Sequence, residues 1–155
     1  MKLVIVGTGY VGLVSGLCFA EFGFETVCVD KDSSRISRLK NEECPFYEPG
    51  LSSLLSKHLK KTKLLSLSSS LSDAMLGADI VFITVGTPTK RLENEADLTA
   101  VYKVADDIAN NINQYCLVVT KSTVPVGTTS EIKKIIERKV NKQKFYPLSA
   151  GVNWM

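Results

Sequence analysis

The chain has 155 residues, 45% of them hydrophobic and 23% charged, and its formal net charge is +3. This length allows one domain with a substantial core, and this composition is ordinary for a soluble α/β protein. The charge is modest and no Lys/Arg cluster is interleaved with aromatic residues, so we expect no nucleic-acid partner.

The first predicted element is a strand over residues 2–6, and a glycine-rich turn follows it directly. Residues 7–12 read Gly-Thr-Gly-Tyr-Val-Gly, the G-x-G-x-x-G pattern of dinucleotide-binding turns, and a helix is predicted over 11–22. In this pattern Gly7 allows the tight turn, Gly9 leaves room for a pyrophosphate, and Gly12 lets helix and strand pack closely. The helix would offer its unpaired N–H groups and the positive end of its dipole to the phosphates.

This region has no charged residue from position 3 to position 20. A signal peptide or a short membrane span would share this character. However, four glycines interrupt the run, and neither a small-residue cleavage pattern nor a stop-transfer flank follows it. We therefore interpret the run as a buried strand and a buried helix, and we expect no membrane partner.

A second strand is predicted over residues 26–29, and Asp30 stands at its end, about 20 residues after the glycine motif. A carboxylate at this place accepts hydrogen bonds from the ribose hydroxyls of the adenosine and repels a 2′-phosphate, which favours NAD over NADP. Lys31 and Arg35 lie close by and soften this preference. The alternative is an ordinary glycine turn followed by an Asp30 that caps the next helix.

The remaining elements alternate between helices and strands with short joints. A helix capped by Asp32 or Ser33 follows the second strand, and further helices are predicted at about 51–59, 73–76, 98–112 and 129–140. Strands are predicted at 64–67, 79–85 and 116–120, with a sixth at 145–148. This alternation predicts an α/β Rossmann fold, a doubly wound parallel sheet of about six strands in the order 3-2-1-4-5-6. The loops after strands one, two, four and five should meet at one edge, where such sheets bind ligands.

The cysteines and the single histidine carry little chemistry in this sequence. The four cysteines form no C-x-x-C pair and show no metal-ligand spacing, so we expect no metal, and a reducing cytoplasm is the simplest compartment. Cys18, Cys28 and Cys116 lie in apolar runs, where a thiol usually packs as a small hydrophobic group. His58 lies in a lysine-rich stretch, where we expect a solvated helix end rather than a catalytic base.

Six short segments of the chain form an ordered pattern: residues 7–14, 28–30, 47–51, 85–89, 96–98 and 121–128. Taken together, they resemble the N-terminal NAD-binding domain of the UDP-glucose/GDP-mannose dehydrogenase family. The similarity covers roughly residues 1–140, and an ordered set of segments is more specific than a glycine motif alone.

The resemblance implies an NAD-dependent, four-electron oxidation of the primary alcohol of a sugar nucleotide to a uronate. It implies that Val11 lies over the pyrophosphate turn, Asp30 holds the ribose and Arg35 lies near the adenosine. Thr87 would contact the cofactor, and Thr123 would lie near the nicotinamide, where its hydroxyl can position the cofactor or a catalytic water. The predicted cofactor-binding residues are Gly7, Gly9, Tyr10, Val11, Gly12, Asp30, Arg35, Gly86, Thr87 and Thr123, of which Thr123 is also the one catalytic candidate.

Simpler interpretations remain for several of these positions. Thr87 and Thr123 could cap the helices that follow them. Lys121 could be a structural lysine at the end of a strand, and Asp97 is expected to be a helix cap rather than a catalytic acid. The stiff loop over residues 47–50 receives no role.

The pattern of the family breaks near the C-terminal end of the sequence. We predict a dinucleotide-binding domain over residues 1–148 and a divergent tail over 149–155, in which the family's Asn-Pro-Glu-Phe-Leu segment and its active-site glutamate have no counterpart. The family's central helix, catalytic cysteine, lysine and substrate domain belong to later sequence. Because no cysteine here lies in a matching context, we expect little or no turnover by this chain alone.

Two functional hypotheses follow. In the first, the chain is the cofactor half of an oxidoreductase and meets a UDP-sugar only if another polypeptide supplies the missing half. In the second, it is a stand-alone NAD-binding or regulatory module without catalysis; FAD as the ligand is a weaker option. We expect a monomer or a weak dimer, because the family's oligomerisation helix lies beyond this domain.

Overall fold

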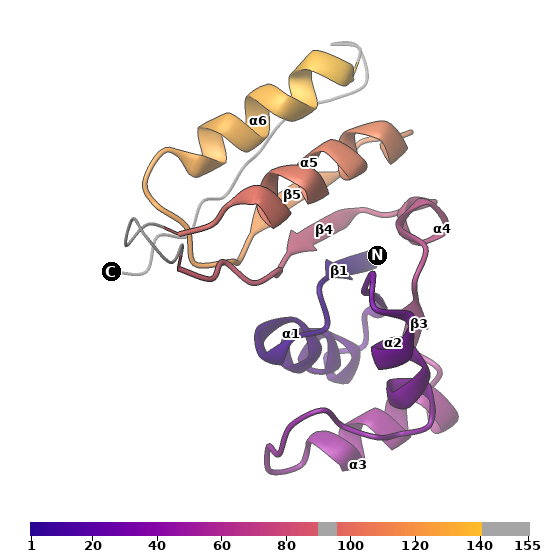
Figure 1. Cartoon of the computed structure of the whole chain (residues 1–155). Helices are drawn as coiled ribbons and strands as arrows, with labels where there is room; N and C mark the ends of the chain where they lie inside the picture. The colour runs from indigo at the N-terminus through magenta and orange to yellow at the C-terminus, as the bar shows by residue number, and fades with distance from the viewer. Residues whose placement is uncertain (90–95, 141–155) are drawn as a thin grey trace.

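The computed structural model describes residues 1–89 and 96–140, which form a parallel five-stranded sheet with helices on both faces (Figure 1). The strand order is β3-β2-β1-β4-β5, and every neighbouring pair is parallel. The strands are β1 Lys2–Val6, β2 Glu25–Val29, β3 Leu65–Ser68, β4 Ile80–Ile83 and β5 Leu117–Thr120. The predicted doubly wound order is thus confirmed for these strands, while the sixth, at 145–148, lies outside the described residues.

The helices follow the predicted alternation closely. They are α1 Tyr10–Glu21, α2 Ser33–Lys40, α3 Leu51–Ser56, η1 Lys57–Lys61, α4 Leu71–Met75, α5 Thr99–Asn111 and α6 Thr128–Lys139. The predicted helix over 51–59 begins where expected, but it continues beyond Ser56 as the π-helical turn η1.

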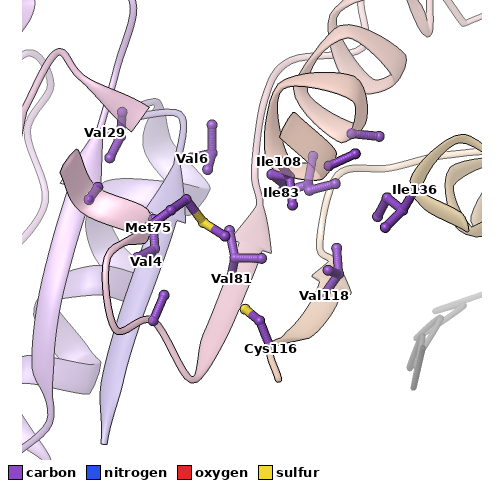
Figure 2. Close-up of a cluster of buried hydrophobic side chains, with 14 of the residues drawn as sticks. Val4, Val6, Val29, Met75, Val81, Ile83, Ile108, Cys116, Val118 and Ile136 are labelled. Carbon is purple, nitrogen blue, oxygen red and sulfur yellow. The ribbon is translucent and has the colours of Figure 1, made fainter. Parts of the chain in front are cut away.

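Two cores lie on the two faces of the sheet, because successive side chains of a strand point to opposite faces. Val4 and Val6 belong to the core that α4, α5 and α6 cover, whereas Ile5 between them belongs to the core under α1, α2 and α3. Figure 1 shows these two groups of helices on either side of the sheet. In Figure 2, Val81 and Ile83 of β4 point toward the first of these cores, together with Ile108 of α5.

The uncharged run at the start of the chain forms β1 and most of α1, as predicted, and Leu13, Leu17 and Ala20 of α1 are fully buried. Within residues 1–89 and 96–140, no helix is long and apolar enough to cross a lipid bilayer. The prediction for Cys18 is wrong, because this thiol is exposed. Cys28 and Cys116 are buried in the cores, as expected.

The prediction for His58 is also wrong. Its side chain is only 1% exposed, and it connects η1 to the C-terminal end of α1. His58 Nε2 lies 2.7 Å from a carboxylate oxygen of Glu21, and Nδ1 lies 2.9 Å from the hydroxyl of Thr62. The same Glu21 accepts a hydrogen bond from Lys57 at 2.7 Å. The hydrogen bonds from Lys57 and His58 lower the pKa of Glu21.

Candidate dinucleotide site

The glycine turn joins the end of β1 to the start of α1 at the edge formed by the carboxyl ends of the strands. Gly7 has a φ of +107°, which favours glycine. At Gly12 a Cβ atom would lie 1.8 Å from the carbonyl oxygen of Gly7, so helix and turn approach too closely for any side chain. The predicted roles of these two glycines, a tight turn and close packing, are therefore confirmed.

Gly9 differs from the other two glycines of the motif. Its φ is −70°, which any residue adopts, and a Cβ built on it would meet nothing within 4 Å among the described residues. Neither backbone conformation nor packing thus requires a glycine here. The open space beside Gly9 is the room that a ligand needs to approach the backbone.

The N-terminal end of α1 faces the same space. Gly9 is its N-cap, and in the described part of the chain no side chain caps the helix and no acidic residue lies in its first turn. The N–H groups of a first helical turn lack partners within the helix, and the helix dipole is positive at this end. This end of α1 is therefore suited to hold an anionic group such as a pyrophosphate.

Asp30 follows β2 and is only 8% exposed. Its Oδ2 accepts hydrogen bonds from the N–H of Thr8 at 2.8 Å and from the hydroxyl of Thr8 at 2.7 Å. The guanidinium of Arg35 donates to the same oxygen at 3.1 Å, and Oδ1 accepts from the N–H of Asp32 at 3.0 Å. Asp30 is thus held directly against the glycine turn, as the sequence predicts.

Two opposing effects set the protonation of Asp30. Burial raises its pKa, but the hydrogen bonds from Asp32 and Thr8 and the charge of Arg35 together outweigh burial, so the pKa is lowered. The carboxylate is therefore ionised at neutral pH. The alternative in which Asp30 caps the next helix is wrong, because Asp32 is the N-cap of α2 and accepts from the N–H of Arg35 at 3.0 Å.

A small pocket lies beside the Asp30–Arg35 pair. Its volume is about 170 Å³, and its lining residues come from α2, its N-cap and the segment after it: Asp32, Ser34, Arg35, Arg38, Glu43 and Pro45. The pocket is lined mainly by polar and charged side chains, and Arg35 belongs both to it and to the ion pair with Asp30.

Thr87 and Thr123 are brought together by the loops after β4 and β5. The hydroxyl of Thr87 donates to the carbonyl oxygen of Thr123 at 2.8 Å, and Thr123 itself is exposed. The capping alternative is wrong for both residues, because α6 has Gly127 as its N-cap and α5 has Leu98. A Cβ at Gly86 would meet nothing within 4 Å in the described structure.

Asp97 and Lys121, for which the sequence predicted structural roles, lie in the segments that follow β4 and β5. The N–H of Thr99 donates to Asp97 Oδ1 at 2.9 Å, so Asp97 supports the start of α5, but the N-cap position itself, predicted for Asp97, is held by Leu98. Lys121 is exposed, and its N–H donates to the carbonyl oxygen of Ile83 at 2.9 Å.

The segment after α2 contacts the start of α1, which the sequence alone did not predict. The hydroxyl of Tyr10, in the first turn of α1, donates to Glu48 at 2.6 Å, and its ring packs on Phe46 with ring centres 5.0 Å apart. The hydrogen bond and the charge of Glu48 raise the pKa of Tyr10. The only sequence signal was the pair of prolines, which indicates a stiff loop but not where that loop lies.

The cysteines offer little nucleophilic chemistry. Burial raises the pKa of Cys28 to about 12 and that of Cys116 to about 11, so both are thiols at neutral pH. Cys18 is exposed and Cys44 is half-buried, and Cys44 accepts a weak hydrogen bond from Ser52 at 3.5 Å. In the described ranges, no group of His, Cys, Asp and Glu side chains gathers as a metal site.

The parallel sheet, the glycine turn and the buried carboxylate together define a dinucleotide-binding domain of the Rossmann type. The model of the UDP-glucose/GDP-mannose dehydrogenase family, NAD binding domain, matches residues 1–153. The chain belongs to this family and carries its NAD-binding domain, as the resemblance implied.

Individual relatives agree with this assignment. The chain is 49% identical over 136 residues to a UDP-glucose 6-dehydrogenase of Rhizobium meliloti, covering 88% of this chain and 31% of that protein. It is 45% identical over 137 residues to the UDP-glucose 6-dehydrogenase TuaD of Bacillus subtilis, covering 88% and 29%. The chain thus spans about a third of the length of these relatives.

Solved structures show the same fold. A UDP-glucose dehydrogenase from Pyrobaculum islandicum superposes with a TM-score of 0.88 at 34% identity, covering 96% of this chain and 35% of that one. A GDP-mannose dehydrogenase from Pseudomonas aeruginosa, in a ternary complex, gives 0.88 at 33% identity, with 96% and 35% covered.

Proposed function

We propose that this chain is the cofactor-binding part of a dehydrogenase that uses NAD to oxidise the primary alcohol of a UDP-sugar to a uronate. The observation that carries the proposal is Gly9, a glycine that the fold does not require, at an uncapped helix end beside a buried carboxylate. The named relatives are UDP-glucose 6-dehydrogenases, which makes UDP-glucose the sugar nucleotide that we propose.

In this proposal each part of the site holds one part of the cofactor. The turn over residues 7–12 and the start of α1 hold the pyrophosphate, with Val11 and Tyr10 beside it. Asp30 Oδ1, which accepts from Asp32, has a further lone pair for a ribose hydroxyl. The adenosine extends toward Arg35 and the pocket next to it.

The loops after β4 and β5 hold the other end of the cofactor. NAD, when bound, accepts a hydride from the carbon that is oxidised. We propose that Gly86 and Thr87 contact the cofactor and that Thr123, whose exposed hydroxyl follows β5, positions the nicotinamide or a water. Thr87 supports this arrangement because its hydrogen bond to the Thr123 carbonyl ties the two loops together.

The second oxidation of such a reaction needs a thiolate that traps the aldehyde. Cys28 and Cys116 are buried thiols, and Cys18 lies on α1. We therefore propose that catalysis needs a nucleophile from a further part of the enzyme, and that residues 1–155 alone do not turn over. The match to the dehydrogenase family disfavours the alternative of a binding module unrelated to oxidoreductase chemistry.

We further propose that residues 1–148 act as one dinucleotide-binding domain, with 149–155 as a divergent tail. The free cysteines among the described residues support a reducing compartment, the cytoplasm. We propose that this segment alone is a monomer or a weak dimer; exposed apolar side chains such as Tyr47 and Val126 could drive self-association.

Calorimetric titration of the 155-residue chain with NAD, NADP and FAD tests the cofactor. We expect NAD to bind and NADP to bind about tenfold more weakly. Asp30→Ala should lower the affinity for NAD about tenfold, because a charged hydrogen-bond acceptor for the ribose is lost. The matched control is Asp79→Ala. Asp79 carries an exposed carboxylate just before β4, at the end of the strands opposite to the glycine turn, so its loss should leave NAD affinity unchanged.

A folded chain that binds none of the three cofactors would overturn the proposal. Tighter binding of FAD than of NAD would show that FAD, and not NAD, is the ligand of this site. The same preparation, mixed with NAD and UDP-glucose, should form no NADH above background. Steady turnover would show instead that this segment already holds its nucleophile.

A further inference from the structure

Thr84 is a buried polar residue that lies beneath the glycine turn and that the proposed function does not use. It directly follows β4 and is 7% exposed. Its hydroxyl lies 2.9 Å from the carbonyl oxygen of Val6 and 2.9 Å from that of Gly7, and its one proton can serve either oxygen. Val6 also accepts from the backbone N–H of Thr84 at 2.9 Å, so its carbonyl keeps a partner without the hydroxyl.

The hydroxyl of Thr84 also touches the place where α1 crosses the turn. A Cβ atom at Gly12 would lie 2.6 Å from Thr84 Oγ1 and 1.8 Å from the carbonyl oxygen of Gly7. The Thr84 hydroxyl, the Gly7 carbonyl and the first turn of α1 therefore form one close contact. The Gly7 carbonyl belongs to the Gly7–Thr8 peptide plane, whose N–H donates to Asp30 Oδ2 at 2.8 Å. The hydroxyl of Thr84 thus holds the other side of this plane, from which the chain enters α1.

The neighbouring loop is held in the same way. The hydroxyl of Ser122, after β5, donates a hydrogen bond to the carbonyl oxygen of Val85 at 2.7 Å, and the carbonyl oxygen of Ile83 lies 3.3 Å from the same hydroxyl. At two successive positions of this edge, a hydroxyl that follows one strand thus fixes the loop after the adjacent strand.

We propose that Thr84 is a positioning residue of the NAD site, whose hydroxyl fixes the Gly7 carbonyl and thereby aims the N–H groups of the glycine turn at the pyrophosphate. This inference rests on the proposed NAD binding. It assigns to Thr84 an effect on cofactor affinity beyond its contribution to folding, because a preformed anion site avoids the cost of ordering the turn on binding.

The test compares Thr84→Val and Thr84→Ser in the full chain, with Thr26→Val as a matched control. Thr26 is likewise a buried residue, and its hydroxyl also donates to a backbone carbonyl, that of Phe24. It lies near the start of β2, at the opposite end of the strands from the glycine turn. The measurements are the thermal midpoint and the calorimetric Kd for NAD at a temperature where every variant is folded.

We expect Thr84→Val to raise the Kd about tenfold, since a buried hydrogen bond at the turn is lost, and Thr84→Ser to restore it to within about twofold. Thr26→Val should lower the thermal midpoint comparably and leave the Kd within about twofold. If Thr84→Val does not fold, Thr84→Ala and Thr26→Ala make the same comparison.

Three results would overturn the inference while leaving NAD binding in place: an unchanged Kd in Thr84→Val, no rescue by serine, or equal weakening by the Thr26 variant. Absence of NAD binding by the unsubstituted chain would contradict the proposed function itself, and the inference with it.

Discussion

The two ends of helix α1 differ in how their polar groups are satisfied. At the C-terminal end, Glu21 accepts hydrogen bonds from Lys57 and from the buried His58, so protein side chains fill the site. At the N-terminal end, the described residues supply no side-chain cap, and the space beside Gly9 is open. One helix thus carries a structural end and a binding end.

The comparison separates residues that serve folding from residues that serve the ligand. Where the protein completes its own hydrogen bonds, a substitution should change stability and leave cofactor affinity unchanged. Where the protein leaves groups for a ligand, the reverse should hold. Gly12 lies between these cases, because it is required by packing but supports the binding end.

The largest effect is expected for Gly12→Ala. Its new methyl group would lie 1.8 Å from the carbonyl oxygen of Gly7, so the turn and the helix must separate. We expect the free energy of unfolding to fall by about 3 kcal/mol, the upper part of the range for overpacking, and NAD affinity to fall with it. Urea denaturation measures the first and calorimetry the second; a stable variant with normal affinity would contradict the close contact.

His58→Ala tests the structural end. It removes a 1% exposed side chain and both of its hydrogen bonds, so we expect a loss of about 2–3 kcal/mol in urea denaturation with an unchanged Kd for NAD. Lys57→Ala, which breaks only an exposed pair with Glu21, is the control and should change the thermal midpoint little. A large change in the Kd for NAD in His58→Ala would show that the C-terminal end of α1 also affects cofactor binding.

Acid should weaken the fold through Asp30. Its pKa is lowered in the folded state, so the unfolded chain binds more protons at low pH; the stabilisation is complete above the ordinary pKa of about 3.9 and is lost as pH falls through the lower folded value. We expect the stability of the Asp30→Asn variant to fall less steeply with decreasing pH than that of the unsubstituted chain, and this reduction in slope to be larger than the one caused by Glu21→Gln. Urea midpoints between about pH 5 and pH 2 measure this, and equal slopes would count against it.

The smallest effect is expected for Tyr10→Phe. The substitution removes the hydroxyl that bonds Glu48 but keeps the ring that packs on Phe46, so the segment after α2 stays near the turn. We expect NAD affinity to fall about threefold or less, as for other exposed polar contacts. Tyr47→Phe is the matched control, because Tyr47 is 89% exposed. Equal NAD affinities of the two variants would show that the Tyr10–Glu48 hydrogen bond does not contribute to binding.

The sequence predicted what local pattern determines. The structural roles of Gly7 and Gly12 follow from short-range spacing, since a glycine turn after a strand has few possible structures. The order of the described strands follows from the alternation of strands and helices. The placement of Asp30 beside the turn follows from the same βαβ unit, in which neighbouring parallel strands end at one edge.

What the sequence did not predict depends on contacts between distant segments. The burial of His58 requires Glu21, far earlier in the chain, and the contact of Thr84 with Gly7 joins β4 to β1. Cys18 was misplaced for a different reason: α1 is apolar on nearly all sides, so periodicity could not identify its exposed face. The role of the Phe46–Glu48 segment likewise depends on Tyr10, which only the fold brings near.

The most direct test of the central claim is Gly9→Ala, followed by thermal unfolding and NAD titration of the same sample. We expect an unchanged thermal midpoint, because the new methyl group meets no described atom. We expect the Kd for NAD to rise at least about tenfold, because the methyl group occupies the space that we assign to the pyrophosphate. A variant that binds NAD normally would show that Gly9 does not make room for the cofactor. A variant that loses stability and affinity together would show that Gly9 is required by the fold.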